Sequence, residues 1–574
     1  MAILSCTGKA STNSKQPSNA LPHHLAFVAD PQLVDPHTYP GRPWPLSTLT
    51  VSYTDLYLRR VYSLLQNRLY PDTTIFLGDL FDGGREWATT GIKNPDERWK
   101  EYGEKFWLSE YKRFGKIFFD TWIDAGVESR DYPFRRRQLL SNLPGNHDLG
   151  FAKGVLKSVK RRFNTYFGDG NRVDIVGNHT FVSVDTVSLS AKEYSDSDPE
   201  IWRPAADFLA DVQDTTRRAL NSELKLRQGL NPNPLYRHAI YQGDGLPESR
   251  LPEPDLRNLA RLPTILLTHV PLYRDGGTPC GPHREHWPPS VDSFGLPLDV
   301  DERNAISISA GYQYQNVLTR EISREITEAI GNVRYAFSGD DHDYCEVVHH
   351  AYPSAGSGIR EITVKSLSWA MGVRRPGFVM LSMWNPIDDK GNSISGSHED
   401  TIQSHLCLLP DQLGIFIRYA LLVVLTLSLL LLRAGHYSLN PAKSAFGSAE
   451  SPVLPVGRDA QLGDVEKAES SSSNDGSCKL PLSAERQGLS ARYLNARPRS
   501  ASPQKGGYGL PAPLIERAGY YGPRENKEAL IDTKIKSKSR RLKGLKLFYV
   551  EFQWSVIKVA FPVLAWYLWL LRSG

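Results

Sequence analysis

The sequence of 574 residues predicts an α/β fold for residues 21–400, and three observations support the prediction. Short apolar runs, rich in β-branched and aromatic residues, alternate with stretches whose apolar residues recur at helical spacing. Several of these runs lead directly into a carboxylate, an amide or an imidazole, as strands do at the functional edge of an α/β sheet. Two long apolar stretches follow in the C-terminal third, and they predict a membrane-associated part.

The predicted strands alternate with predicted helices along the chain. The first two strands are His24–Asp30 and Thr73–Asp79, and a third apolar run ends at Leu143, before a loop that Pro144 and Gly145 introduce. Further strands are expected at 173–176, 180–185, Pro263–His269 and Val333–Gly339, and within 359–384. Apolar residues at helical spacing predict helices at 48–70, 97–124, 151–167, 204–227 and 321–330.

Charge and cysteine content exclude several classes of protein. The chain carries 68 basic and 63 acidic residues, a net charge of +5, which does not indicate a nucleic-acid-binding protein. Five cysteines without a CxxC pair are too few for a disulfide scaffold and do not form a zinc ribbon. A disulfide between Cys280 and Cys345 is one alternative, and it would require an oxidising compartment.

Two segments have the length and composition of membrane helices. Ile415–Leu432 contains one charge, Arg418, and eighteen helical residues rise roughly 27 Å, close to the thickness of the bilayer core. We predict a transmembrane helix at 413–433. The second segment, 547–571, is rich in Trp and Tyr, so it predicts either a second transmembrane helix or a helix at the membrane interface.

The remaining parts of the chain have a polar composition. Residues 1–20 predict a disordered N-terminus that is neither a signal peptide nor a membrane anchor. Residues 186–262 form a polar insertion in the α/β domain. Residues 434–545, rich in Ser, Pro and Gly, predict a disordered linker between the two apolar segments.

The strand ends carry a set of side chains that suits a metal site. Taken singly, each is typical of a turn carboxylate or of a buried, hydrogen-bonded histidine. Together they supply oxygen and nitrogen ligands without thiolate, as Mn²⁺, Fe²⁺ or Zn²⁺ prefer. Asp79 has two oxygens and could bridge two ions, which would clamp the phosphoryl group of a displacement reaction. The set is Asp30, Asp79, Asn146, His147, His269, Asp340 and His342.

Five short blocks resemble those of the calcineurin-like metallophosphoesterases, over about residues 22–385. These blocks are Asp30-x-Gln32, Gly78-Asp79-x-x-Asp82-x-Gly84, Gly145-Asn146-His147-Asp148, Thr268-His269 and Gly339-x-x-His342. Longer segments resemble one branch, the fungal cell-division-control and Ted phosphoesterases and the mammalian post-GPI-attachment phosphoesterase. The longer segments are Ala29–Gln32, Leu77–Arg85, Pro271–Arg274 and Ser338–Cys345.

The resemblance implies a four-layer α/β/β/α sandwich with two metal ions, most consistent with Mn²⁺. By their position in the blocks, Asp30, Gln32 and His342 would hold the first ion, Asp79 would bridge, and Asn146, His269 and Asp340 would hold the second. His147 would be the general acid, oriented by Asp148. Gln32 and Asp340 stand where the family usually has histidines. Gln is a weak neutral donor, whereas the harder Asp favours Mn²⁺ over Zn²⁺.

The resemblance also implies a reaction: hydrolysis that removes ethanolamine phosphate from a mannose of GPI anchors. The substrate would be a GPI lipid or a GPI-anchored protein in membranes of the endoplasmic reticulum or early secretory pathway. Two basic clusters flank the predicted linker, so the positive-inside rule predicts a cytosolic linker and a luminal catalytic domain. The clusters are Arg433 with Lys443, and Lys534, Lys536, Lys538, Arg540, Arg541, Lys543 and Lys546. The sequon Asn178-His179-Thr180 permits this orientation.

A luminal domain needs an N-terminal signal or anchor, so we expect the sequence to be incomplete at its first exon. Two other functions remain open: a cytosolic or peripheral phosphatase acting on phosphoproteins or nucleotides, and a metal-poor scaffold, which Gln32 and Asp340 would permit. Arg274, Arg374 and Arg375 could contact a substrate phosphate, although solvated surface positions are the favoured interpretation.

Overall fold

The computed structural model describes residues 22–90, 96–129, 136–229, 259–354, 356–394, 401–440 and 544–573. The chain separates into two units: one comprises the residues up to Leu429 and those from Val556 onward, and the other comprises Leu430–Ser555. The predicted disordered N-terminus and most of the predicted linker lie outside the described residues.

Two mixed sheets form the centre of the first unit. The first has the strand order β13-β12-β1-β2-β3 and the second the order β10-β11-β9-β6-β5-β4. Strands β1, β2 and β3 are mutually parallel, as are β5, β6, β9 and β11 in the second sheet. The first sheet comprises β1 (His23–Val28), β2 (Thr73–Phe76), β3 (Gln138–Leu140), β12 (Gly377–Met383) and β13 (Ile402–Leu408). The second comprises β4 (Arg172–Val176), β5 (His179–Ser183), β6 (Thr264–Leu267), β9 (Val333–Ser338), β10 (Cys345–His349) and β11 (Ile359–Thr363).

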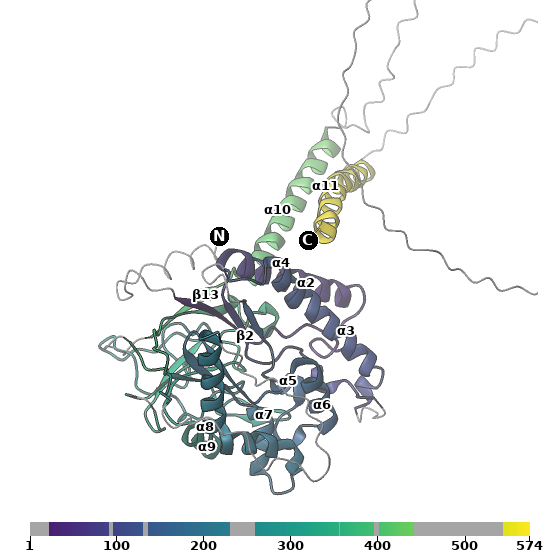
Figure 1. The fold of residues 1–574 in the computed structure, drawn as a ribbon. Coiled ribbons are helices and arrows are strands. Elements are labelled where there is room, and N and C mark those ends of the chain that lie inside the picture. The colour runs from purple at the N-terminus through teal and green to yellow at the C-terminus, as the bar shows by residue number, and fades with distance from the viewer. Residues whose placement is uncertain are drawn as a thin grey trace, which may run out of the picture. The chain divides into compact units, whose positions relative to one another are not determined.

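The two sheets pack face to face, with helices on their outer faces. Phe27 of β1 and Phe337 of β9 stack between the sheets with ring centroids 4.4 Å apart. Successive strand residues point to opposite faces, so Ala26 and Val28 belong instead to the cluster that includes Leu58 of α2. The structure therefore confirms the four-layer α/β/β/α sandwich. Figure 1 shows α2 and α3 on one side of the domain and α8 and α9 on the other.

The helices have the following bounds: α2 Leu46–Leu64, α3 Glu104–Phe114, α4 Asp120–Ala125, α5 Asn146–Leu149, α6 Lys157–Phe167, α7 Thr186–Leu189, α8 Pro199–Arg227, α9 Arg320–Ile330, α10 Gln412–Leu439 and α11 Leu545–Ser573. Helix α8 begins after Asp198, whose carboxylate accepts a hydrogen bond from Glu200 N at 3.0 Å. Helix α9 begins after Thr319, which caps Ile322 N.

Several predicted boundaries differ from the structure. The predicted helix 97–124 is interrupted: a short turn at Glu97–Trp99 precedes α3, which begins only after Gly103. Within the predicted insertion, α8 buries Ile201, Leu209 and Val212 in the main core, so this part is a structural layer of the domain. The first sheet also extends past residue 400, because β13 pairs with β12. Residues 230–258 of the insertion lie outside the described part.

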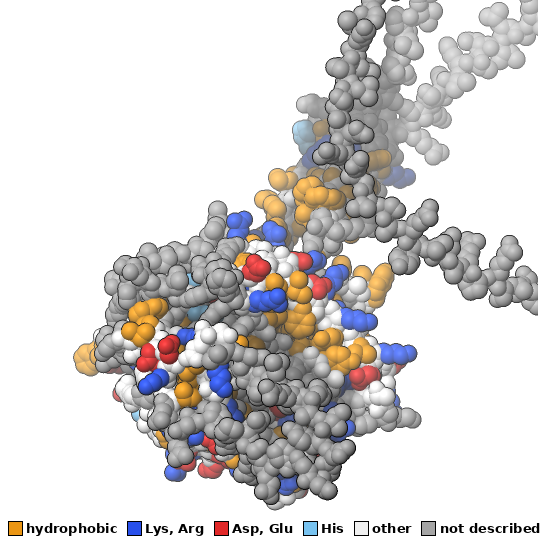
Figure 2. All heavy atoms as spheres, viewed as in Figure 1, with side chains coloured by type: hydrophobic (Ala, Val, Ile, Leu, Met, Phe, Trp, Pro, Cys, Tyr) orange, Lys and Arg blue, Asp and Glu red, His pale blue; other side chains and the backbone are white. Residues whose placement is uncertain are grey.

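Both predicted apolar segments are helical in the structure. Helices α10 and α11 are each long and apolar enough to cross a membrane. Figure 2 shows hydrophobic side chains along α10, and those of Leu421, Leu422 and Val424 are exposed by more than half. The start of α10 packs on α2, where Tyr53 donates a hydrogen bond to Gln412 at 3.0 Å. These helices support association with a membrane.

Candidate metal centre

The predicted ligands converge at the carboxyl ends of β1, β2, β6 and β9. Asp30, Asp79 and His342 offer ligand atoms that all lie within 4.8 Å of one another, and so do Asp79, His269 and Asp340. Asp79 belongs to both groups. This arrangement suits two neighbouring ions that share one carboxylate.

The backbone at these positions adopts an uncommon conformation. Left-handed φ angles are rare for residues other than glycine, and they cluster at functional sites. Five of the ten described non-glycine residues with positive φ belong to the predicted ligand set. They are Asp30 (45°), Gln32 (29°), Asp79 (51°), Asp340 (70°) and His342 (63°). The strand ends are therefore bent so that their side chains turn to a common point.

His269 shows why this point suits a cation. Its Nδ1 donates to the carbonyl oxygen of Leu77 at 2.8 Å, so Nε2 carries the lone pair of the neutral ring. Nε2 lies 3.1 Å from Asn146 Oδ1, 3.3 Å from Asp79 Oδ1 and 3.5 Å from Asp340 Oδ1. These are four electron-rich atoms, and a metal cation or a second proton would satisfy them together.

The electrostatics of the site lead to the same conclusion. Burial opposes the charged imidazole of His269, but the charges of Asp79 and Asp340 outweigh burial and raise the pKa of His269 well above its usual value. Burial also opposes the charged form of Asp79, yet His269 and His147 lower the pKa of this carboxyl. The site therefore favours positive charge beside Asp79, as a divalent ion would provide, whereas burial raises the pKa of Asp30 to about 7.

The first group of ligands has oxygen atoms without protein partners. Asp30 Oδ2 and Gln32 Oε1 are buried and accept no hydrogen bond in the described structure. The amide of Gln32 is oriented, because its Nε2 donates to Asp79 Oδ2 at 2.7 Å. Buried polar oxygens usually have a donor, so these two atoms fit coordination to an ion.

The turn at Gly145–His147 is built closely around Asp79. A Cβ atom on Gly145 would lie 2.0 Å from Asp79 Oδ1, so only glycine fits this position. His147 N donates to the same oxygen at 2.8 Å. Asn146 Nδ2 donates to the carbonyl oxygen of Gln313 at 3.0 Å, which turns Asn146 Oδ1 toward His269.

The Asp148 carboxylate has partners other than the His147 ring, so its role in orienting His147 stays a prediction. The Asp148 carboxylate accepts hydrogen bonds from three backbone N–H groups, those of Leu80 (3.0 Å), Phe81 (3.1 Å) and Gly145 (2.9 Å). His147 Nδ1 instead donates to the carbonyl oxygen of Asp82 at 2.6 Å and lies 3.5 Å from Asp82 Oδ1. Asp148 lies three residues after Gly145, where it satisfies one free N–H group of its own turn and two of the loop after β2.

Three residues at the site were not assigned from the sequence. Asp82 lies within a recognised block, but its contact with His147 crosses 65 residues of sequence. Gln313 contacts Asn146 across 167 residues, and His37 contacts Asp82 across 45. No local pattern marks Gln313 or His37, because their roles depend on how distant loops meet.

No family model matches the chain, but curated proteins do. Cell division control protein 1 of Saccharomyces cerevisiae is 35% identical over 405 residues, which are 70% of this chain and 64% of that protein. Protein TED1 of the same yeast is 25% identical over 393 residues, covering 60% of this chain and 71% of that protein. Metallophosphoesterase 1 of Mus musculus is 25% identical over 315 residues, covering 55% and 59%. The chain is thus similar to curated proteins that include several metallophosphoesterases.

Solved structures were also compared with the chain. A dimetal phosphatase of Danio rerio is 12% identical, covers 63% of this chain and 93% of its own, and has a TM-score of 0.29. A 5'-nucleotidase precursor of Thermus thermophilus is 11% identical, covers 70% and 58%, and has a TM-score of 0.26. Both TM-scores are below 0.5, so the fold assignment rests on the sheets and helices described above. The chain spans less than two thirds of the length of cell division control protein 1.

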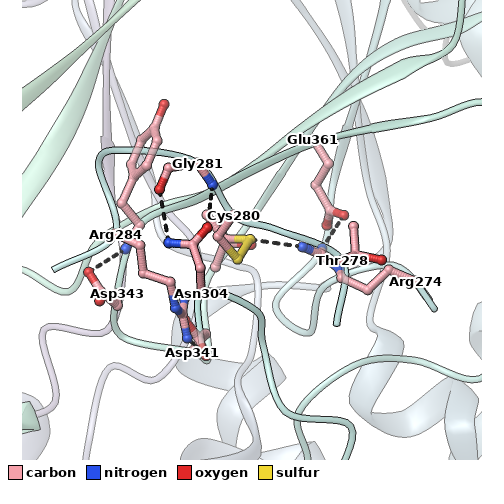
Figure 3. The surroundings of a disulfide bond; sticks show 12 residues. Arg274, Thr278, Cys280, Gly281, Arg284, Asn304, Asp341, Asp343 and Glu361 are labelled. Atoms are coloured by element: carbon pink, nitrogen blue, oxygen red, sulfur yellow. Dashed lines mark hydrogen bonds and ion pairs between the residues drawn. A yellow bond between two sulfur atoms is a disulfide. The ribbon is translucent and has the colours of Figure 1, made fainter. Parts of the chain in front are cut away.

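A disulfide stabilises the loop that carries the last two predicted ligands. Cys280 and Cys345 form a disulfide, which was one alternative considered from the sequence. Cys345 begins β10, directly after the loop that carries Asp340 and His342. Within the same loop, Asp341 pairs with Arg284 at 2.6 Å. Figure 3 shows the disulfide with Arg284 and Asp341 on one side and Arg274 on the other.

Two of the three arginines considered as phosphate contacts, Arg274 and Arg374, have other side-chain partners. Arg274 is only 4% exposed, and its guanidinium pairs with Glu361 at 2.5 Å and contacts Cys345 Sγ at 3.1 Å. The favoured interpretation of Arg274 as a solvated surface residue is therefore wrong. Arg374 is exposed and pairs with Asp411 at 2.7 Å, as a surface residue would.

Proposed function

We propose that the chain is a membrane-bound, di-metal phosphodiesterase that removes ethanolamine phosphate from a mannose of GPI anchors. The observation that carries the phosphoesterase part is the pair of ligand groups sharing Asp79. The names of the curated relatives support the same chemistry. The finer substrate assignment rests on the motif resemblance and on the two apolar helices, which would confine enzyme and lipid-linked substrate to one membrane.

The proposed ligands are those predicted from the blocks. Asp30, Gln32 and His342 would hold one ion, Asn146, His269 and Asp340 the other, with Asp79 shared. Five of these seven side chains offer oxygen, which favours the harder ion Mn²⁺ over Zn²⁺. When bound, two divalent ions would polarise the phosphoryl oxygens and supply an activated water.

His147 is the proposed general acid. Its Nδ1 proton is engaged by the carbonyl oxygen of Asp82, so Nε2 is the atom that can deliver a proton to the leaving oxygen. A group in this role contributes roughly 10²–10⁴-fold to the rate. Asp148 takes no part in proton transfer in this proposal. Its carboxylate instead fixes the turn that presents His147.

We further propose that the catalytic domain is luminal, in the endoplasmic reticulum or early secretory membranes, and that both α10 and α11 span the bilayer. The Cys280–Cys345 disulfide supports an oxidising compartment. Basic residues between the two helices support a cytosolic linker.

Mass spectrometry of GPI glycans from cells lacking the gene tests the proposal. We expect ethanolamine phosphate to be retained on one mannose, and expect wild type but not Asp79→Asn to remove it. Asp207→Asn, at an exposed position of α8, is the matched control and should rescue fully. Unchanged glycans in the deletion strain, with the purified protein still cleaving phosphodiesters, would reject the substrate and keep the chemistry. Cleavage of phosphomonoesters alone would favour the phosphatase alternative.

A further inference from the structure

A third cluster of side chains lies beside the two ligand groups and is not used by the ligand assignment. It consists of His37, Asp82 and His147, which come from three separate segments of the chain. His37 lies between β1 and α2, Asp82 follows β2, and His147 lies in α5. The side chains of His37 and His147 are 22% and 23% exposed, whereas that of Asp82 is 7% exposed.

The contacts in this cluster are hydrogen bonds that meet on Asp82. His37 Nδ1 lies 2.9 Å from Asp82 Oδ2. His147 Nδ1 lies 2.6 Å from the carbonyl oxygen of the same residue and 3.5 Å from its Oδ1. Both rings therefore turn Nδ1 toward Asp82 at distances that a shared proton satisfies. A hydrogen-bond network explains the cluster better than a third metal ion.

The loop that carries His37 is fixed to the loop that carries Asp82. The Asp35 carboxylate accepts hydrogen bonds from His37 N at 2.8 Å and from Gly83 N at 2.9 Å. A Cβ atom on Gly83 would lie 2.9 Å from the Cβ of His37, so the two loops are in close contact. The His37 ring also lies edge-on to the His147 ring, with centroids 5.9 Å apart. His37 is therefore held at a fixed position beside the proposed acid.

We propose that His37 is a positioning residue for the general acid. Its bond to Asp82 Oδ2 fixes the position of Asp82, so that the carbonyl oxygen of Asp82 can hold the Nδ1 proton of His147 and direct Nε2 at the leaving oxygen. This inference rests on the proposed phosphoesterase function. In this proposal, proton delivery to the leaving group depends on His37. The effect of His37 on the rate should therefore vary with how much the leaving group needs a proton.

Substitutions at His37 can separate this role from a general structural one. His37→Phe keeps a ring of similar size without a donor, and His37→Asn keeps a donor near the position of Nδ1. The full-length proteins, reconstituted with Mn²⁺ in detergent, would be assayed on aryl methyl phosphodiesters. The leaving groups would range from p-nitrophenol, which leaves without a proton, to phenol, which benefits from one.

We expect His37→Phe to leave kcat for the p-nitrophenyl ester unchanged and to lower kcat for the phenyl ester about tenfold. His37→Asn should restore most of the loss. His286→Phe is the matched control, because His286 Nδ1 makes an equal 2.9 Å contact with Asp343, away from His147. Its ratio of phenyl to p-nitrophenyl rates should equal that of wild type.

Three results would overturn the inference. One is an equal fall in kcat for every leaving group, which would indicate a structural role. Another is the loss of a bound ion from His37→Phe in metal analysis, which would make His37 a ligand. The third is wild-type protein inactive on the whole series, which would reject the phosphoesterase function itself and this inference with it. If His37→Phe does not fold, His37→Ala provides the donor-free comparison.

Discussion

The ligands in the two halves of the candidate metal centre are oriented in different ways. The first half consists of Asp30, Gln32 and His342, the second of Asn146, His269 and Asp340, and Asp79 belongs to both. In the second half, His269 and Asn146 are each oriented by a backbone carbonyl, from Leu77 and Gln313 respectively. In the first half, Asp30 Oδ2 and Gln32 Oε1 are buried without a donor. The second half is thus aligned by backbone carbonyls, whereas in the first half Gln32 is held by Asp79 and two oxygens still lack a donor that an ion could replace. We expect the second half to bind its ion more tightly.

The largest expected effect comes from the residue that both halves share. Asp79→Asn removes a charge from both ligand groups, so we expect loss of both ions and a fall in activity of about 10⁴-fold. Asp30→Asn should lose only the ion of the first half. Elemental analysis of the two purified variants checks this difference. Equal metal content in Asp79→Asn and wild type would contradict the bridging role.

Metal removal should lower stability, chiefly through the first half. A buried polar atom without a partner costs about 1–3 kcal/mol, and the first half contains two such oxygens. Thermal unfolding of the chelated protein, followed by stepwise addition of Mn²⁺, measures the effect. We expect most of the rise in Tm as the second equivalent binds. Full recovery of Tm with the first equivalent would show that an ion in the first half does not contribute to stability.

Gln313→Ala should weaken ion binding in the second half of the site specifically. The side chain of Gln313 accepts a hydrogen bond from Phe151 N at 2.7 Å and donates to the carbonyl oxygen of Gly154 at 3.2 Å, and so holds the carbonyl group that Asn146 contacts. Loss of such a support typically costs about 10–100-fold in metal affinity, and we expect the lower end here. Calorimetric titration should show one weakened site and one unchanged site. Equal weakening of both would remove the distinction between the halves.

The same contrast explains what the sequence could and could not predict. Ligands such as Asp30, Asp79 and His269 directly follow apolar strands, so a local pattern marks them, and parallel strands bring their ends together. The four-layer arrangement followed from the recognised blocks. The orientation of these ligands was not predictable, because Gln313 and Leu77 act through backbone carbonyls that carry no sequence signal.

The partners of Asp148 were not predictable for a related reason. Adjacency in the sequence suggested that it orients His147, whereas the structure directs its carboxylate to backbone N–H groups of its own turn and of the loop after β2. The partner of the His147 ring, Asp82, comes from another loop. Strand β13 was missed for a different reason: it directly precedes α10, and the expected domain boundary at residue 400 excluded it.

The smallest expected effect tests whether Gln32 is the cause of the weaker ion binding expected in the first half. Gln32→His replaces a neutral oxygen donor with an imidazole but loses the hydrogen bond to Asp79 Oδ2. We expect the weaker site to tighten by roughly five- to tenfold and to shift its preference from Mn²⁺ toward Zn²⁺. Competition with a fluorescent chelator measures both quantities. Asp340→His is the matched change in the aligned half, where the same shift toward Zn²⁺ should occur without tightening of the Mn²⁺ site. If Gln32→His leaves the weaker site unchanged, the looseness arises from the missing hydrogen-bond donors around Asp30 and not from the ligand type at position 32.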